Sequence, residues 1–127
     1  MATILTDQPL DPQNVLKQLG MGDGTGSLVV HCAVVKRDID EGKSTGISFT
    51  PIDDVEKELQ SLETALREEW NITNLVLARR TGNLRVGDTI SVVAATASGH
   101  EQAFGVCRQA IKGFKSMKSL AKEELLE

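Results

Sequence analysis

The chain has 127 residues, a net charge of −4 and 40% hydrophobic residues, which is the size and composition of one globular domain. The acidic balance excludes the broad positive field behind non-specific nucleic-acid binding, and no stretch approaches the ~20 apolar residues of a membrane span. The N-terminal segment also lacks the pattern of a signal peptide. We therefore expect a single cytoplasmic domain over residues 1–127 that binds neither nucleic acid nor membrane.

The first part of the chain predicts a short helix and two strands. Asp11 suits the N-cap of the helix, Pro12 its first position and Gly20 its stop. The run GMGDGTGS that follows has no phosphate-loop lysine and no dinucleotide-binding spacing, so it is expected to be a turn. Residues 27–36 and the segment GISFTPI are rich in β-branched residues and predict strands. These two strands are close in sequence, and we expect them to pair as an antiparallel hairpin.

The strongest helix signal is the segment DDVEKELQSLETALREEW at residues 53–70. Its apolar residues recur at helical spacing and predict one buried face, made of Val55, Leu59, Leu62 and Leu66. Glu63 and Arg67 are spaced to form an ion pair, which we expect on the solvated side of this helix.

The second half of the chain predicts two more strands and a last helix. The segment NITNLVLARRTGNLRVGDTISVVAATA indicates a strand, a turn region around Gly82 and Gly87, and another strand. In the segment HEQAFGVCRQAIKGFKSMKSL, helical spacing predicts a buried face made of Phe104, Cys107, Ile111 and Phe114. The order of elements predicts an α+β fold with about three helices packed on a mostly antiparallel sheet.

Four lysines lie close together at the end of this acidic chain: Lys112, Lys115, Lys118 and Lys122. If the last helix continued, Lys115 and Lys122 would share a face, roughly 10 Å apart along the axis, with Lys118 near them. Two interpretations are open from the residues alone. The lysines form a solvated face whose stems cover apolar surface, or some of them project into a site.

Cys32 and Cys107 are the only cysteines, and we expect them to be reduced and to pack as small hydrophobic residues. A metal site that combines them with His31 and His100 is disfavoured. His31 and Cys32 are adjacent, so their side chains point to opposite faces of a strand. We predict no metal.

Four segments, in this order, resemble the large, catalytic subunit of molybdopterin synthase: PLDPQNVLKQL, EKELQSLETALREEW, RRTGNLRVGDTISVVAATA and AFGVCRQAIKGFK. The most specific piece is Gly82-x-Leu84-x-Val86-Gly87-Asp88, followed by Ala103-Phe104 and the tail lysines. The resemblance implies transfer of sulfur from the C-terminal thiocarboxylate of a small ubiquitin-like subunit, which ends in Gly-Gly, to cyclic pyranopterin monophosphate. The product is the dithiolene of molybdopterin. The resemblance also implies a homodimer that carries one small subunit on each side, as a heterotetramer, and no cofactor for this step.

The two catalytic lysines of the family match Lys115 and Lys122. The substrate carries a phosphate, and the reaction passes through tetrahedral oxyanions at a glycyl carbonyl, so ammonium groups in a closed pocket would stabilise the developing charge. We assign Lys115 to the partner's terminal carbonyl and the transferred sulfur, and Lys122 to substrate positioning or proton transfer. Lys118 is assigned to substrate binding beside them.

Three more positions are matched to substrate binding, and each departs from the family pattern. Where the family has an arginine after the first long strand, this chain has Lys36, with Arg37 next to it. His100 stands where an arginine is expected, and it also suits the polar start of a helix. Two alternatives to an active enzyme therefore stay open. One is a catalytically impaired relative that acts as a dimeric docking module for a ubiquitin-like sulfur carrier, and the other is an anion or nucleic-acid binder that uses the basic tail.

Overall fold

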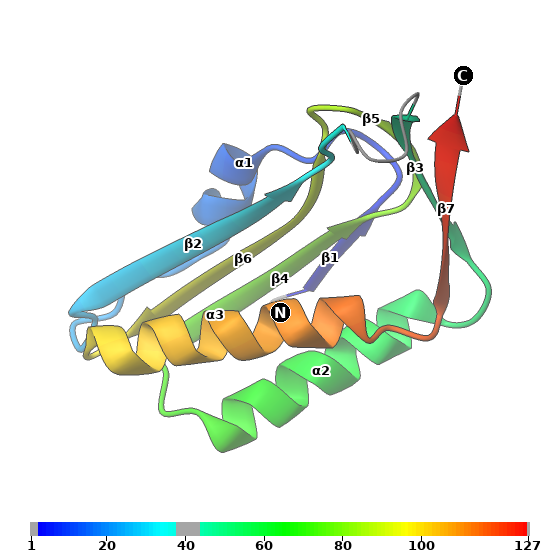
Figure 1. Ribbon diagram of the computed structural model, residues 1–127. Helices are drawn as coiled ribbons and strands as arrows, with labels where there is room; N and C mark the ends of the chain where they lie inside the picture. Colours follow the sequence, from blue (N-terminus) through cyan, green and yellow to red (C-terminus); the bar gives the residue numbers. More distant parts are fainter. Residues whose placement is uncertain (1–2, 38–43, 127) are drawn as a thin grey trace.

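The computed structural model describes residues 3–37 and 44–126. In this part of the chain there are two β-sheets, and the helices pack on the larger one (Figure 1). The helices are α1 (Pro12–Lys17), α2 (Val55–Glu69) and α3 (His100–Lys115). The strands are β1 (Thr3–Thr6), β2 (Ser27–Val34), β3 (Ser44–Pro51), β4 (Asn74–Arg80), β5 (Gly82–Arg85), β6 (Thr89–Ala97) and β7 (Leu120–Leu126). The predicted α+β class is confirmed.

The larger sheet has the strand order β1-β4-β6-β2, and the smaller sheet has the order β5-β3-β7. Within the described residues, β1 pairs with β4 in parallel, and the other pairs are antiparallel. Helices α2 and α3 lie along one face of the larger sheet, and α1 lies on the other face (Figure 1). The smaller sheet stands beyond the C-terminal end of α3, where β7 leaves the helix (Figure 1).

Strands β4 and β6 form the centre of the larger sheet and are buried on both faces. Successive side chains of a strand point to opposite faces. Leu75 and Leu77 accordingly pack into the core under α2 and α3, whereas Val76 and Ala78 pack into the core under α1. Covering on both faces explains why these strands are continuous apolar runs in the sequence instead of alternating ones.

The helix starts follow the sequence signals. The Asp11 carboxylate accepts a hydrogen bond from the Gln13 amide at 2.9 Å, and Asp54 accepts one from the Lys57 amide at 3.0 Å. Each satisfies an amide that has no partner within its helix. Helix α1 ends at Lys17, earlier than the glycine stop predicted from the sequence. None of the described helices is both long enough and apolar enough to cross a membrane.

The predicted hairpin of the second and third strands is wrong. Strand β2 pairs with β6 in the larger sheet, and β3 pairs with β5 and β7 in the smaller sheet. The polar segment between them falls largely at residues 38–43, outside the described residues. Closeness in sequence favoured a hairpin, but β2 pairs over its whole length, Ser27–Val34, with β6 as the edge strand of the larger sheet. Strand β3 pairs instead with the tail of the chain.

Two predictions of burial are also wrong. Phe104 is 52% exposed, because the buried face of α3 is made of smaller residues such as Ala103 and Val106 that let the helix approach the sheet closely. Glu63 is not on the solvated side of α2, since only 7% of it is exposed.

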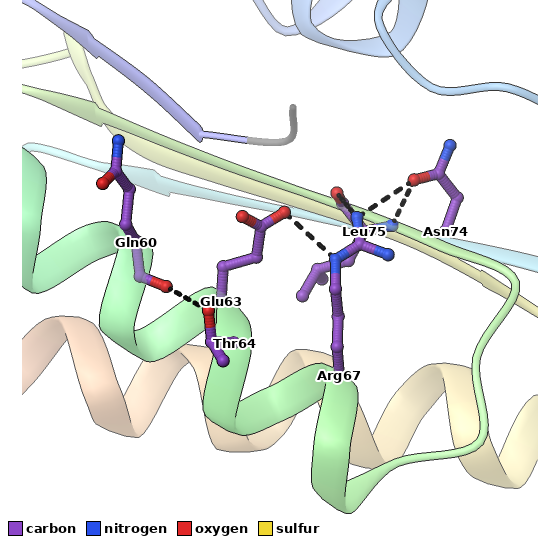
Figure 2. Close-up of polar contacts among 6 residues, drawn as sticks. All are labelled: Gln60, Glu63, Thr64, Arg67, Asn74 and Leu75. Carbon is purple, nitrogen blue, oxygen red and sulfur yellow. Dashed lines mark hydrogen bonds and ion pairs between the residues drawn. The ribbon is translucent and has the colours of Figure 1, made fainter.

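The predicted ion pair of Glu63 does form, at the seam between α2 and the start of β4. Arg67 Nε lies 3.1 Å from Glu63 Oε2, and its Nη2 donates to the Leu75 carbonyl at 3.0 Å (Figure 2). The same Nη2 donates to Asn74 Oδ1 at 3.3 Å. The pair therefore ties the end of α2 to β4, with Glu63 buried and Arg67 still partly exposed to solvent.

Candidate functional site

A cavity of about 420 Å³ lies where the end of α3 and the smaller sheet meet the larger sheet. Its apolar wall includes Phe49 of β3, Phe114 of α3 and Leu120 of β7. Its cations are Lys115, Lys122 and Arg79. No carboxylate of the described residues lines it. The cavity therefore combines aromatic walls with an excess of positive charge, which suits an anionic ligand that has an apolar part.

The two lysines predicted to be catalytic both line this cavity, but they do not share a helical face. Helix α3 ends at Lys115, where the Ser116 amide bonds back to the last carbonyls, and the chain then turns into β7. Strand β7 runs antiparallel to β3 with Lys122 opposite Phe49. The predicted last helix is therefore shorter than the segment HEQAFGVCRQAIKGFKSMKSL, and it does not continue to Lys122. The lysines meet because the tail folds back as a strand.

The turn between α3 and β7 is held by a residue that the sequence analysis did not single out. Glu58 of α2 accepts hydrogen bonds from the Lys118 amide at 3.0 Å, the Ser119 amide at 2.9 Å and the Ser119 hydroxyl at 2.5 Å. Ser119 in turn accepts a bond from the Ile52 amide through its carbonyl at 2.8 Å. We call Glu58 and Ser119 the turn clasp. It sets where β7 begins and so where Lys122 lies.

The carboxyl of Glu58 is kept ionised by this arrangement. Burial by itself raises the pKa of Glu58, but the bonds from the Ser119 hydroxyl and the amides of Lys118 and Ser119 outweigh it. The positive charge of Lys118 acts in the same direction. The net effect is a pKa below the ordinary value of 4.5.

Arg79 is the second residue that the sequence analysis missed. It lies near the end of β4, and only 6% of it is exposed. Its Cζ is 4.4 Å from the centre of the Phe49 ring and 5.8 Å from that of Phe114, close enough for cation–π attraction. Burial lowers the pKa of Arg79 to about 10, so the guanidinium is still protonated at neutral pH. A charged residue in the apolar strand NLVLARR was the available signal.

Three of the residues assigned to substrate binding lie outside this cavity. Lys118 is exposed and lines a separate shallow hollow beside Asp53 and Asp54. Lys36 and Arg37 are exposed just beyond the end of β2. They do not line the cavity in a single chain.

The fourth such residue, His100, lies at the opposite end of α3 from Lys115. It is the first of the 16 residues of the helix, and a rise of 1.5 Å per residue separates the two by roughly 22 Å. His100 is exposed, and the N-cap Gly99 provides no side-chain hydrogen bond. Within one chain the structure therefore brings together Lys115 and Lys122, and not the other four predicted residues.

The cysteines are not nucleophiles of this site. Cys107 is buried and its thiol donates to the Val29 carbonyl over 3.7 Å, and burial raises its pKa to about 11. Burial also raises the pKa of Cys32. The prediction that His31 and Cys32 face opposite sides is confirmed, since His31 lines the cavity and Cys32 packs into the core under α1. Across residues 3–37 and 44–126 no group of three metal-binding side chains comes together.

These features define an α+β protein with a cationic, aromatic-walled cavity at the junction of two sheets. The sequence model of the family described as "MoaE protein" matches residues 5–117, so the chain belongs to the MoaE family. This membership gives the protein a role in molybdenum cofactor biosynthesis, and specifically in molybdopterin synthesis. The predicted family is thereby confirmed.

Solved structures show the same fold at low sequence identity. Molybdopterin synthase from Staphylococcus aureus superimposes with a TM-score of 0.86 at 19% identity, covering 98% of this chain and 90% of that chain. The molybdopterin biosynthesis MoaE protein from Burkholderia ambifaria superimposes with a TM-score of 0.79 at 18% identity, covering 100% of this chain and 87% of that chain. A chain from the complex of subunits 1 and 2 of molybdopterin-converting factor from Helicobacter pylori superimposes with a TM-score of 0.71 at 15% identity, covering 99% of this chain and 84% of that chain. No curated protein sequence matches.

Proposed function

We propose that this protein is the sulfur-transferring large subunit of molybdopterin synthase. It would take sulfur from the C-terminal thiocarboxylate of a small ubiquitin-like subunit ending in Gly-Gly and place it on cyclic pyranopterin monophosphate. The observation that carries the proposal is that Lys115 and Lys122, from two different elements, line one cavity with aromatic walls and no carboxylate of the described residues. The complex of two subunits known for the Helicobacter pylori protein supports a small partner.

The chemistry assigns the two lysines different tasks. Release of sulfur from the glycyl carbonyl needs stabilisation of a tetrahedral oxyanion, and an ammonium group in the cavity supplies positive charge where that oxyanion develops. Lys115 takes this task, because the helix end holds its backbone. Lys122 lies on β7, opposite Phe49, and takes the task of positioning the substrate or moving a proton.

A second copy of the chain is part of this proposal. Strand β2 is an edge of the larger sheet, and Leu28, Val30 and Val34 are exposed on it. An unpaired edge with apolar side chains is a surface for association. A homodimer with a small subunit on each side would make the heterotetramer. In this dimer, His100, Lys36 and Arg37 of one chain would contact the substrate bound to the other chain, which they do not reach within a single chain.

The test is reconstitution of the reaction. The purified chain is mixed with a small subunit that bears a C-terminal thiocarboxylate and with cyclic pyranopterin monophosphate, and molybdopterin is detected as its oxidised fluorescent derivative. Lys115→Ala should abolish product. The matched control is Lys112→Ala, which removes an exposed lysine of the same helix end that does not line the cavity. The control should keep the wild-type rate.

A docking module that binds the sulfur carrier but transfers nothing is the second candidate. It is favoured by the position of Lys36, Arg37, Lys118 and His100 outside the cavity. This function predicts a stable complex with the small subunit and no molybdopterin from the wild-type chain. The reconstitution assay, combined with size-exclusion chromatography of the mixture, separates the two functions.

A further inference from the structure

Arg79 is a buried cation without a counter-charge in the described part of the chain. Its Nε is buried and has no hydrogen-bond partner among the described residues. The next residue, Arg80, also has a buried Nε without a partner among the described residues, but its Nη1 lies 3.4 Å from the Asp88 carboxylate. The two neighbouring arginines at the end of β4 therefore differ in whether a carboxylate lies beside them. One is paired with a carboxylate, and the other is placed in the wall of the cavity.

The aromatic rings around Arg79 offset only part of the cost of burying it. A charge taken out of water without a hydrogen-bonded partner is strongly disfavoured, and contact with the faces of Phe49 and Phe114 returns a modest share of that energy. Lys115 and Lys122 in the same cavity are exposed and add repulsion. An apolar residue of the same length would avoid the cost of burying this charge. An anionic group bound beside Arg79 would offset that cost.

We propose that Arg79 forms an oxyanion-binding subsite at the inner end of the cavity, where its guanidinium takes a phosphate or carboxylate group of the ligand. The planar guanidinium presents parallel N–H donors that match two oxygens of either group. Binding there leaves Lys115 and Lys122, the exposed cations, at the open side for the reacting atoms. Binding of an oxyanion does not depend on sulfur transfer. Only the choice of ligands tested, a phosphate for the pterin and a peptide carboxylate for the partner's tail, rests on the proposed function.

The test follows the side-chain Nε–Hε signal of Arg79 by ¹⁵N–¹H NMR while the free protein is titrated with inorganic phosphate or with glycylglycine. Arg79→Met keeps the length and removes the charge, and Arg79→Lys keeps the charge without the fork. Lys112→Met is the control, because it makes the same change in net charge outside the cavity. Affinities are also measured by calorimetry, and Tm is recorded for each variant without ligand.

The proposal expects one titrant to shift the Arg79 signal with saturation. Arg79→Met should bind that titrant with an affinity lower by roughly tenfold or more, as expected for loss of hydrogen bonds to a charged group. The affinity of Arg79→Lys should lie between those of the wild type and Arg79→Met, and the affinity of Lys112→Met should match that of the wild type. The titrant that shifts the signal identifies the group as phosphate or carboxylate. Tm of Arg79→Met should equal or exceed that of the wild type.

Two results would overturn the proposal. One is that neither titrant shifts the Arg79 signal. The other is that Arg79→Met binds the titrants like the wild type while its Tm falls, which would mean that the arginine only packs between the rings. Neither readout uses sulfur transfer. An inactive protein with intact anion binding would therefore count against the proposed function alone.

Discussion

Removing the turn clasp should loosen β7 and displace Lys122. In Glu58→Ala the amides of Lys118 and Ser119 and the Ser119 hydroxyl lose their common acceptor. Ser119 is only 4% exposed, so water cannot fully replace the carboxylate at its donors. Loss of hydrogen bonds to a charged and partly exposed acceptor costs about 2 kcal/mol, which for a domain of this size lowers Tm by roughly 6–10 °C.

Thermal unfolding followed by circular dichroism measures this change, with Glu56→Ala as the matched control. Glu56 is an exposed carboxylate in the same first turn of α2, so both variants lose the same favourable interaction with the helix dipole. Only Glu58→Ala loses the clasp. Its molybdopterin production should also fall, because Lys122 is no longer held in register with Phe49. Equal Tm values for Glu58→Ala and Glu56→Ala would show that the turn clasp does not stabilise the fold.

The remaining predictions concern pH and packing. Because the folded pKa of Glu58 is lowered, its contribution to stability is complete above the ordinary value of 4.5 and is lost as pH falls through the folded pKa. The Tm difference between wild type and Glu58→Ala should therefore shrink below about pH 4.5, as shown by thermal scans at pH 3–7. Gly105→Ala would place a methyl group against the Trp70 ring and should destabilise by about 1–3 kcal/mol, measured by urea unfolding. Gly22→Ala is the control, because its added methyl group would have no atom within 4 Å, and its free energy of unfolding should be nearly unchanged.

The elements that the sequence predicted well are those determined by local pattern. The apolar spacing of α2 and the covered strands β4 and β6 depend on residues close in sequence, and their positions agree with the structure. Strand β7 could not be predicted in this way. Its segment LAKEELL has no clear alternation and becomes a strand because β3 offers an edge and Glu58 holds the preceding turn.

The site shows the same division between local and distant causes. The resemblance to the family pointed to Lys115 and Lys122, and both line the cavity, although they come from a helix and a strand and not from one helical face. Arg79 was missed because its significance lies in burial between two rings from distant elements. Glu58 was missed because its partners are about 60 residues away in the chain. The neighbouring sequence does not identify the partners of either residue, although a charged residue in the apolar strand NLVLARR was a signal for Arg79.

The role of Lys115 in sulfur transfer is tested by comparing wild type and Lys115→Ala in the reconstituted reaction, with Tm and affinity for the small subunit measured for both. An exposed lysine contributes little to stability, so both proteins should be equally folded and bind the partner alike. We expect molybdopterin from the wild type and none from Lys115→Ala. Turnover by Lys115→Ala at the wild-type rate would exclude a catalytic role for this lysine.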